Sequence, residues 1–354
     1  MIFNLLYNMY IFRADGNAGI GVGHLMRCLT IADAMLSDID VEDICFVCAD
    51  EQSADIVKER GYKAYVLHTD YVDMDKELCE WQELKVSGAV ILVDSYFVTD
   101  SYLEGLKAFG KVIYMDDMQK KAYPVDGVIN YNVFAEPEKY SLLYGNNVSC
   151  FAGGTYIPVR EQFLAKKGVL RDSVSNVLIT TGGGDMENIA GQIFEKLAAD
   201  NHTIHFHVVS GVYNPNYEVL KRLETKQSNL HIYYNVKNMA ELMMKCDVAI
   251  TAGGSTIYEL AALGIPFICF SYAENQEQLV QFIGERDIAG YAGSYEKDSA
   301  AMFNNMQTIF RLLCESHALR KTYSLKETEL VDGKGAHRTA RILQDFHASF
   351  QKNI

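Results

Sequence analysis

Short runs of apolar residues alternate with amphipathic segments along the first half of the chain. Runs of this kind, rich in β-branched residues and without polar alternation, are typical of strands that are buried on both faces. The predicted strands of the first half are residues 10–12, 44–47, 64–67, 89–93 and 112–115. The predicted helices between them are an apolar series at helical spacing from Leu25 to Leu36 and the segments 54–60 and 102–109. Strands that alternate with helices predict a parallel, doubly wound sheet.

The same alternation begins again in the second half. A polar and charged stretch, residues 166–176, is the predicted linker between the halves. We therefore expect an α/β chain with two doubly wound, Rossmann-like domains that face each other across a cleft. The predicted strands of the second half are residues 177–180, 204–209, 231–234, 248–250 and 267–270, with helices over 189–199 and 256–263 between them.

The two expected domains have different roles. Residues 1–165 form the first α/β domain, which carries the loop with the candidate catalytic histidine, and residues 175–335 form the second, UDP-binding domain. A last helix over 336–354 is expected to pack back on the first domain, by analogy with the fold named below. The length of 354 residues agrees with two domains, because single domains most often hold about 100–150 residues.

The charge and composition argue against several classes of protein. The net charge of −14 argues against nucleic acid as a partner, because proteins that bind it carry basic stripes for its phosphates. No apolar run approaches the roughly 20 residues of a membrane helix, so no stable membrane insertion is expected. The first residues, 1–12, are apolar but lack a basic leader and a cleavage site, which argues against a signal peptide. Whether the chain starts at Met1 or at Met9 is left open.

The cysteines favour a reducing compartment. There are eight, scattered along the chain, and Cys45 and Cys48 lie in an apolar strand without a second pair that could complete a zinc site. We expect buried thiols, a cytoplasmic protein, and neither a cofactor nor a metal. The oligomeric state is left open, with a monomer as one option.

Glycine-rich turns follow predicted strands and precede predicted helices in both halves. They are residues 13–24 (RADGNAGIGVGH), 180–185 (TTGGGD) and 251–256 (TAGGST). In open α/β sheets ligands bind at the carboxyl ends of strands, and glycine lets backbone N–H groups approach a phosphate beside a helix N-terminus. Each loop alone is also compatible with an ordinary tight turn. Three of them, spread over two domains, predict a phosphate-binding cleft.

The first loop superficially resembles a dinucleotide-binding fingerprint. In that fingerprint a third glycine allows close helix packing, and here His24 takes its place after Gly19 and Gly21. A hydride-transferring dehydrogenase is therefore disfavoured.

Together, these and other short motifs resemble one family, the UDP-sugar hydrolases of pseudaminic acid biosynthesis. The likeness extends from about Met9 to the C-terminal helix and leaves out residues 1–8, and the combination of motifs is specific although no single one is. The motifs are Arg13-Ala-Asp15-Gly with Gly21-x-Gly23-His24 and Arg27, Val93-Asp94-Ser95-Tyr96, Gly153-Gly154 with Ile157 and Arg160, Gly182-Gly183-Gly184, Ala252-Gly253-Gly254-Ser255-Thr256, Glu274-Asn275-Gln276 and Val331-Asp332-Gly333-Lys334-Gly335.

The resemblance implies both a fold and a reaction. The fold is glycosyltransferase-B (GT-B), related to the enzyme that adds GlcNAc in peptidoglycan synthesis. The reaction is hydrolysis of UDP-2,4-diacetamido-2,4,6-trideoxy-β-L-altropyranose to UDP and the free sugar. Spore-coat polysaccharide proteins share several of the motifs, so the sugar is less firmly implied than the fold.

The catalytic candidates implied by the resemblance are His24, Tyr96 and Asp94. His24 matches the proposed catalytic base of the family, and an ordinary imidazole, which ionises near pH 6.5, can accept a proton from water at neutral pH. Its alternative role is only to hydrogen-bond the loop. Tyr96 matches a tyrosine near the sugar and could position water or substrate, and Asp94 could equally cap the next helix. Because UDP is a stabilised leaving group, one base should suffice, and direct attack by water predicts inversion at the anomeric carbon.

The remaining candidates are assigned to substrate binding. Glu259 is expected to hold the ribose hydroxyls, as a glutamate after this loop does in the GT-B fold, although Thr256-x-x-Glu259 also matches a capping box. Arg160 either faces the cleft or bridges surface carboxylates, and Asn275 and Gln276 either contact substrate or begin a polar helix. The expected binding residues are Arg13, Asp15, Gly21, Gly23, Arg27, Arg160, Gly182, Gly183, Gly184, Gly253, Gly254, Ser255, Thr256, Glu259, Asn275 and Gln276.

Two further carboxylates, Asp116 and Asp117, end another predicted strand. They are adjacent and lack further ligands, so helix or turn capping and solvation are expected in place of a metal site.

Other functions would share the nucleotide site. A true glycosyltransferase of peptidoglycan synthesis usually has an apolar or basic membrane-facing patch for its acceptor, and the acidic sequence shows no clear one. A UDP-sugar 2-epimerase would return an isomerised product, and a silent nucleotide-sugar-binding protein would show no turnover. Kinetics and product analysis separate these alternatives.

Overall fold

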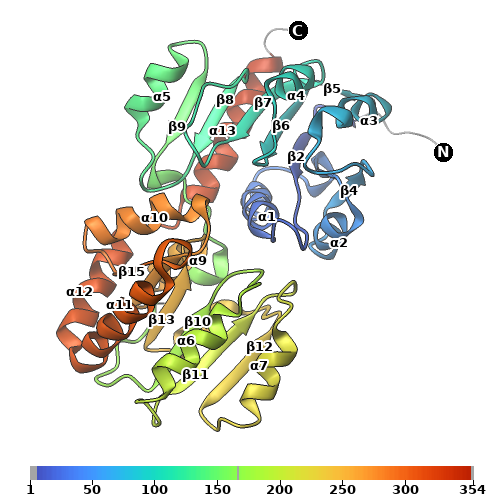
Figure 1. Cartoon of the computed structure of the whole chain (residues 1–354). Helices are drawn as coiled ribbons and strands as arrows, with labels where there is room; N and C mark the ends of the chain where they lie inside the picture. Colours follow the sequence, from blue (N-terminus) through green and yellow to red (C-terminus); the bar gives the residue numbers. More distant parts are fainter. Residues whose placement is uncertain (1–5, 166, 352–354) are drawn as a thin grey trace. The chain divides into compact units, whose positions relative to one another are not determined.

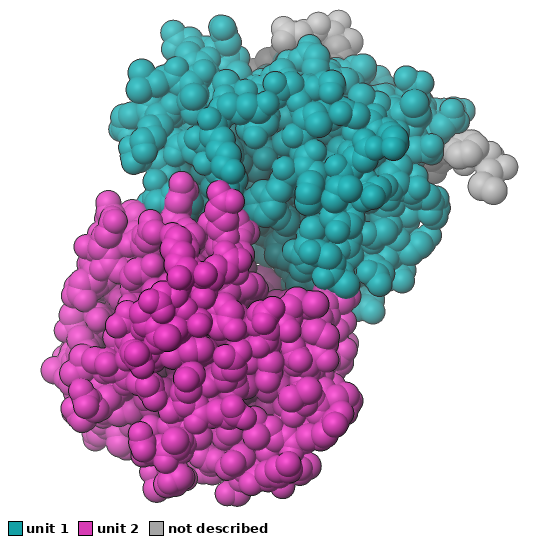
Figure 2. Space-filling model, viewed as in Figure 1, with its two compact units in different colours: residues 1–158, 334–354 teal, residues 159–333 magenta. Residues whose placement is uncertain are grey.

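The computed structural model describes residues 6–165 and 167–351, and contacts divide them into two units (Figures 1 and 2). Unit 1 consists of the chain up to Pro158 and from Lys334 onward, and unit 2 consists of Val159–Gly333. Each unit is a parallel sheet with helices on its faces, and its apolar core lies between the sheet and these helices. The predicted α/β class with two Rossmann-like halves is confirmed.

Unit 1 contains a seven-stranded parallel sheet in the order β4-β3-β2-β6-β7-β8-β9. All five strands predicted for this half are present. The strands β8 and β9 were not predicted, because they are only four residues long and have glycine, asparagine or serine at their ends. A separate parallel pair joins β1 (Leu6–Tyr7) to β5 (Val86–Ser87). The strands of the main sheet are β2 (Tyr10–Ala14), β3 (Ile44–Cys48), β4 (Lys63–Val66), β6 (Ala89–Asp94), β7 (Gly110–Met115), β8 (Gly127–Asn130) and β9 (Ser149–Ala152).

The helices of unit 1 include the last helix of the chain. This helix, α13, contacts α1, β6 and β7. Its first residue must be small, because a Cβ at Gly335 would stand 2.1 Å from the carbonyl oxygen of Ile157. Of the segment 336–354 in which the sequence predicts a helix, residues 352–354 lie outside the described residues. The helices are α1 (Gly23–Met35), α2 (Glu51–Glu59), α3 (Glu77–Glu83), α4 (Asp100–Leu106), α5 (Pro137–Tyr144) and α13 (Gly335–Gln351), with short 3-10 turns at Val41–Asp43, Met74–Lys76 and Gly154–Tyr156.

Unit 2 contains a six-stranded parallel sheet in the order β12-β11-β10-β13-β14-β15. The five predicted strands are present, and β15, which begins and nearly ends with glycine, was not predicted. The strands are β10 (Asn176–Thr180), β11 (His205–Ser210), β12 (Leu230–Tyr234), β13 (Val248–Ala252), β14 (Phe267–Ser271) and β15 (Gly290–Ser294). The helices are α6 (Ile189–Ala198), α7 (Tyr217–Glu224), α8 (Met239–Lys245), α9 (Thr256–Leu263), α10 (Glu274–Glu285), α11 (Tyr295–Glu315) and α12 (His317–Glu329), with a 3-10 turn at Glu161–Phe163.

The segment predicted as a linker is attached to unit 2. Residue 166 lies outside the described residues, and 167–175 contain neither helix nor strand. The N–H of Gly168 donates to the carbonyl oxygen of Leu263 at 2.7 Å, and Arg171 pairs with Asp247 at 2.7 Å. The division between the units therefore falls earlier in the chain, after Pro158. None of the described helices is long and apolar enough to cross a bilayer.

A buried histidine on β11 makes the stability of unit 2 depend on pH. Nδ1 of His207 lies 3.1 Å from the hydroxyl of Tyr233, and its Nε2 lies 3.0 Å from Oδ1 of Asn176. Burial, followed by the charges of His231 and His205, lowers the pKa of His207 to about 4. Between about pH 6.5 and pH 4, the His207 imidazole is therefore protonated in the unfolded chain but neutral in the folded one.

We expect unit 2 to lose stability as the pH falls from about 6.5 to about 4, because the unfolded chain binds the extra proton throughout that window. Solvent screening limits the loss from His207 to about 1–2 kcal/mol of unfolding free energy. Urea unfolding at pH 7 and pH 4.5 measures this loss, and His207→Gln, which cannot titrate, should lose correspondingly less. An equal loss in the two proteins would contradict this assignment.

Candidate functional site

Both sheets reverse their strand order beside the first long strand of the unit. In unit 1, β2 lies between β3 and β6, and in unit 2, β10 lies between β11 and β13. Ligands of open α/β sheets bind beyond the carboxyl ends of strands at such a switch point. The loop after β2 and Asp94 at the end of β6 belong to the first switch point, and the other two glycine loops follow β10 and β13 at the second. The topology thus gathers the sequence-predicted residues at one place in each unit.

Hydrogen bonds fix the loop between β2 and α1. Gly21, with φ of 73°, donates its N–H to the carbonyl oxygen of Asn17 at 2.8 Å, and the side chain of Asn17 donates to Asp50 at 2.7 Å. No side chain caps α1, and no atom lies within 4 Å of the place where a Cβ at Gly23 would stand. The partial positive charge at the N-terminus of α1 is therefore left without a capping side chain.

Arg13 and Asp15, which the sequence assigned to substrate binding, are buried behind this loop. Nη1 of Arg13 donates to Asp15 at 2.5 Å, its Nε donates to Glu77 at 2.8 Å, and its Nη2 makes a second, shorter bond to Glu77. Asp15 also accepts from the N–H of Ala49 at 2.7 Å. Arg13 is 0% exposed and Asp15 is 2% exposed, so neither side chain is accessible to a ligand. We interpret them as supports of the loop, with Glu77 as a partner that the sequence did not indicate.

His24, the second residue of α1, is oriented by Asp94. Its Nδ1 lies 2.6 Å from Oδ1 of Asp94. Burial alone would raise the pKa of Asp94, but the charges of Arg27 and His24 lower it below its usual range, so this carboxylate only accepts hydrogen bonds. Nη2 of Arg27 also lies 3.0 Å from this Nδ1, but it donates to Asp94 and pairs with Asp117 as well. Because Asp94 can only accept, we assign the ring hydrogen to Nδ1, which leaves Nε2 as the proton acceptor. Asp94 does not cap the following helix, because Thr99 caps α4.

Arg27 lies one turn after His24 on α1 and joins two carboxylates. Its Nε and Nη2 contact Asp94 at 2.5 Å each, and its Nη1 and Nη2 contact Asp117 at 3.0 and 2.8 Å. Nη1 also donates to the hydroxyl of Tyr131 at 2.6 Å. Both edges of the guanidinium are thus occupied by protein groups. These bonds order the cluster around His24, and the predicted contact of Arg27 with substrate stays a prediction.

Tyr96 lies beside His24 and is the exposed member of the cluster. The two rings meet edge to face with centroids 4.5 Å apart, and the Tyr96 hydroxyl donates to Oδ2 of Asp117 at 2.9 Å. Tyr96 is 41% exposed, whereas Asp117 is only 8% exposed. The expectation that Asp117 is a solvated cap is wrong, because this carboxylate is buried against Arg27 and Tyr96.

Asp116, its neighbour, has a local role. Its Oδ1 accepts from the N–H groups of Met118 and Gln119 at 2.9 and 3.1 Å, which is a turn cap as expected. It is 1% exposed rather than solvated, and its Oδ2 accepts from the hydroxyl of Tyr140 at 2.7 Å. Asp116 therefore stabilises the turn after β7, and its side-chain hydrogen bonds go to groups other than Arg27, Tyr96 and His24.

In unit 2, the loop after β10 contains the three consecutive glycines. Gly182 has φ of 90°, a conformation that favours glycine, and the hydroxyl of Tyr272 donates to the carbonyl oxygen of Thr181 at 2.9 Å. The carboxylate of Asp185 accepts from the first two N–H groups of α6 at 2.7 and 2.9 Å. The N-terminus of α6 is therefore already capped by a negative charge. Gly183 packs against Gly211, and the space around a Cβ at Gly184 is open.

The loop after β13 leads into a helix with a different N-terminus. The capping box considered for Thr256 and Glu259 is not formed, because Thr256 is the first residue of α9 and the preceding Ser255 makes no side-chain capping bond. The N-terminus of α9 thus presents its partial positive charge without a capping side chain.

Glu259 pairs with Arg160 within unit 2. Its Oε1 accepts from Nε and Nη2 of Arg160 at 3.0 and 2.7 Å, and the guanidinium lies over the ring of Phe163 at 4.9 Å. Burial raises the pKa of Glu259, although the charge of Arg160 opposes this shift. Arg160 therefore does not bridge surface carboxylates but holds one partly buried glutamate in place.

Gly253 and Gly254 differ in what surrounds them. A Cβ at Gly253 would lie 2.6 Å from Cγ1 of Val280 and 3.0 Å from Cβ of Gln276, whereas no atom lies within 4 Å of a Cβ at Gly254. We expect Gly253→Ala to lower the unfolding free energy by about 1–3 kcal/mol through overpacking against α10. Gly254→Ala, its matched control, should change it by less than about 0.5 kcal/mol. Urea denaturation measures both, and equal stability of the two variants would contradict the packing described.

Asn275 and Gln276 are the second and third residues of α10. Oε1 of Gln276 accepts from the N–H of Tyr272 at 3.0 Å, so this side chain shapes the turn after β14. Asn275 is exposed at the second position of the helix.

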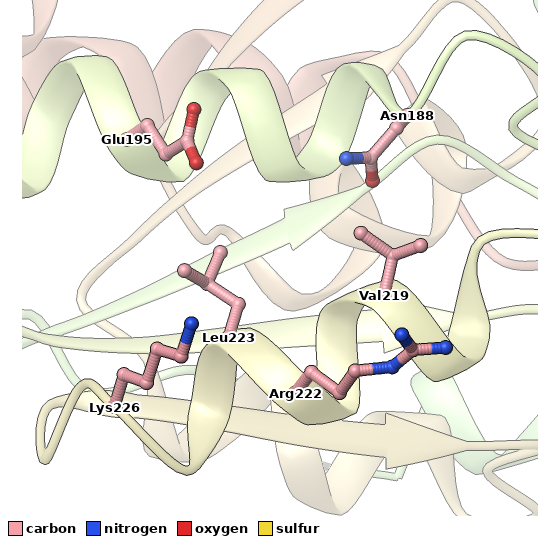
Figure 3. Close-up of a pocket in the computed structure, with 6 residues that line it drawn as sticks. All are labelled: Asn188, Glu195, Val219, Arg222, Leu223 and Lys226. Atoms are coloured by element: carbon pink, nitrogen blue, oxygen red, sulfur yellow. The ribbon is translucent and has the colours of Figure 1, made fainter.

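One pocket lies apart from all of these residues, between α6 and α7 (Figure 3). None of the sequence-predicted site residues lines it, and its lining mixes apolar and charged side chains. The pocket is lined by Asn188, Glu195, Val219, Arg222, Leu223 and Lys226. In the described part of the chain, no group of three or more His, Cys, Asp or Glu side chains is arranged to hold a metal ion.

The chain is similar to one known domain family and to several known proteins. Residues 161–289 match the glycosyltransferase family 28 C-terminal domain. The chain is 24% identical to the UDP-2,4-diacetamido-2,4,6-trideoxy-β-L-altropyranose hydrolase of Campylobacter jejuni, over 81% of this chain and 98% of that protein. It is 23% identical to the spore coat polysaccharide biosynthesis protein SpsG of Bacillus subtilis, over 94% and 97% of the two chains. The resemblance to the UDP-sugar hydrolases is thereby confirmed.

A third relative is longer. An uncharacterized protein of Methanocaldococcus jannaschii is 27% identical over 75% of this chain, which spans 56% of that protein. Among solved structures, MurG of Acinetobacter baumannii has a TM-score of 0.64 at 12% identity, over 96% of this chain and 99% of that one. The UDP-GlcNAc 2-epimerase of Neisseria meningitidis, bound to UDP-GlcNAc, has a TM-score of 0.61 at 12% identity, over 96% and 100%. These likenesses show the GT-B fold.

Proposed function

We propose that this chain, which has the GT-B fold and resembles the UDP-sugar hydrolases, releases UDP from a UDP-sugar by attack of water at the anomeric carbon. One observation carries the proposal: the 2.6 Å contact between His24 and Asp94, which leaves Nε2 of the imidazole as a proton acceptor. The pair lies at the switch point of unit 1, where ligands of open sheets bind. The hydrolase name of the Campylobacter jejuni relative supports the same reaction.

In this proposal unit 2 binds the nucleotide. The diphosphate interacts with the uncapped N-terminus of α9, which carries about half a positive charge, and Gly254 leaves room for it. The N-terminus of α6 is less suitable because Asp185 already occupies it. Glu259 accepts hydrogen bonds from the ribose hydroxyls, and Arg160 fixes the orientation of its carboxylate.

The chemical step needs one base. Nε2 of His24 takes a proton from water while the water oxygen forms a bond to the anomeric carbon. The bond from that carbon to the β-phosphate oxygen breaks, and UDP leaves with the electron pair. Asp94 holds the Nδ1 hydrogen and stabilises the imidazolium, which later returns its proton to solvent. Direct displacement inverts the configuration at the anomeric carbon.

The leaving group explains why a general acid is not part of the proposal. Glycosidases that expel an alkoxide use a second carboxyl group to protonate it. UDP leaves as an anion that its own phosphates stabilise, and the helix N-terminus in unit 2 adds to that stabilisation. A base for water and electrostatic stabilisation of the diphosphate are therefore sufficient.

We further propose UDP-2,4-diacetamido-2,4,6-trideoxy-β-L-altropyranose as the substrate, which places the reaction in pseudaminic acid biosynthesis. The name of the Campylobacter jejuni relative supports this sugar. The spore coat relative makes a comparison with other UDP-sugars part of the test.

The test is UDP release from this UDP-sugar without an acceptor, in the presence and absence of EDTA, with UDP-GlcNAc as the comparison. We expect release of UDP that EDTA does not abolish, and slower release from UDP-GlcNAc. Release only after addition of an acceptor would identify a transferase, and return of an isomerised nucleotide sugar would identify an epimerase. Either result would refute the hydrolase.

A further inference from the structure

A chain of hydrogen bonds crosses the carboxyl ends of three adjacent strands in unit 1. Asp94 ends β6, Asp117 lies two residues after β7, and Asn132 lies two residues after β8. The side chain of Asn132 donates to Oδ1 of Asp117 at 3.2 Å. Together with Arg27 and Tyr96, this bond holds the Asp117 carboxylate in a single orientation. The sequence-predicted catalytic residues do not include Asp117, although it accepts a hydrogen bond from one of them, Tyr96, and pairs with Arg27, which contacts another, Asp94.

The charges of this cluster do not cancel. Arg27 carries one positive charge, whereas Asp94 and Asp117 each carry one negative charge, so the cluster holds one excess negative charge while His24 is neutral. Arg27 and Asp94 alone would be neutral. Transfer of a proton to His24 brings the whole cluster to neutrality, and partial burial makes this balance energetically important.

Neutral groups complete the surroundings. Sγ of Cys28 lies 3.6 Å from Asp94, and the Tyr131 hydroxyl accepts from Arg27. Burial raises the pKa of Cys28 and of Tyr131, so neither contributes charge at neutral pH. The buried carboxyl of Asp116 interacts electrostatically with Asp117, but its own hydrogen bonds go to Tyr140 and to the turn after β7. Among the groups bonded to Arg27, Asp117 is the carboxylate beyond Asp94 that gives the cluster its excess negative charge.

Asp117 also determines what the Tyr96 hydroxyl can do. A phenol has one hydroxyl proton, and Tyr96 gives it to Asp117 at 2.9 Å. Tyr96 is then not the donor that would protonate a leaving group. The same bond holds the Tyr96 ring against the imidazole of His24, with centroids 4.5 Å apart.

We propose that Asp117 is a positioning residue of the hydrolysis, which holds Tyr96 against His24 and, through Arg27, supplies the negative charge that stabilises His24 when it takes a proton from water. The kinetic consequence rests on the proposed function. The charge relation between Asp117 and His24 does not, because it can be measured without substrate.

The experiment compares Asp117→Asn with Asp116→Asn, a matched control in which the same substitution is made one residue away and outside the cluster. Long-range ¹H–¹⁵N NMR of the histidine ring follows the pH at which the His24 imidazole takes up its second proton. We expect this midpoint to fall by about 0.5–1 pH unit in Asp117→Asn and to stay unchanged in Asp116→Asn. Asp117→Glu, which keeps the charge, should restore the midpoint.

The kinetic part uses the full chain and the UDP-sugar. We expect Asp117→Asn to lower kcat about 10- to 100-fold, with the Kd for UDP within twofold of wild type, and to move the acidic limb of the kcat profile to lower pH. Tyr96→Phe, which keeps every charge and replaces a partly exposed side chain, should lower kcat without moving the midpoint. The double variant should lose less than the product of the two single losses, because Asp117 acts partly through Tyr96.

The outcomes separate the two proposals. If wild type releases no UDP but Asp117→Asn still shifts the His24 midpoint, the hydrolase proposal fails and the charge relation stands. If hydrolysis stands but the midpoint is the same in Asp117→Asn, Asp116→Asn and wild type, the role of Asp117 is refuted. If Asp117→Asn does not fold, the Tyr96→Phe variant tests the proposal instead. An unchanged kcat in Tyr96→Phe would overturn the proposal, and so would a shift of the His24 midpoint, because this variant keeps every charge.

Discussion

Replacing His24 by alanine is expected to lower kcat for UDP release about 10²- to 10⁴-fold, the usual range for loss of a general base. The affinity for UDP should stay within twofold of wild type, because the groups proposed to bind the nucleotide belong to unit 2, whereas His24 belongs to unit 1. Asp94 keeps both of its bonds to Arg27 in this variant, so the fold should survive. Steady-state kinetics and calorimetric titration with UDP measure the two quantities.

A matched control is His317→Ala. His317 is an exposed histidine at the first position of α12, whereas His24 is at the second position of α1. This control should leave kcat unchanged. A His24→Ala enzyme that keeps more than about a tenth of wild-type kcat would remove the base from the mechanism.

The second large effect is expected for Asp94→Asn. Asp94 accepts from His24 at one oxygen and from Arg27 at both, so an amide must turn its NH₂ group toward a donor in either orientation. The histidine loses the partner that selects its tautomer, and we expect kcat to fall about 10²- to 10⁴-fold. The buried positive charge of Arg27 also loses the negative charge of Asp94 beside it, so the unfolding free energy should fall by about 2–4 kcal/mol.

Kinetics and urea denaturation of Asp94→Asn test this prediction together. The Kd for UDP serves as the internal control, because it should change little. A variant with kcat within threefold of wild type would show that the contact between His24 and Asp94 does not direct the chemistry, whatever the loss of stability.

The sequence predicts the architecture well for a physical reason. Strands buried on both faces must be apolar throughout, and runs such as residues 89–93 and 248–250 meet this condition without knowledge of their neighbours. The glycine loops follow such strands directly, so their placement at the carboxyl edge follows from the strand assignment. The roles of His24 and Asp94 came from the resemblance to the UDP-sugar hydrolases, and the strand assignment adds that both lie at or beyond the end of a strand.

The sequence could not predict the partners across the sheet. Arg27 and Asp117 are 90 residues apart, and Arg13 and Glu77 are 64 residues apart, so their contacts depend on strand order rather than on local spacing. Asp116 and Asp117 look alike in sequence, yet adjacent side chains beyond a strand end point to different neighbours. The capping box that the sequence offered as the alternative for Glu259 is absent, because Thr256 is the first residue of α9 and not its cap, and Glu259 instead accepts from Arg160.

The measurement that tests the central claim most directly is hydrolysis of the UDP-sugar in ¹⁸O-enriched water, followed by mass spectrometry of the UDP and NMR of the fresh sugar. Attack of water at the anomeric carbon predicts UDP without ¹⁸O and a first product of inverted anomeric configuration. Incorporation of ¹⁸O into the β-phosphate of UDP would show attack at phosphorus, and retention of configuration would show a covalent intermediate. Either result would contradict the account in which His24 activates water toward the sugar.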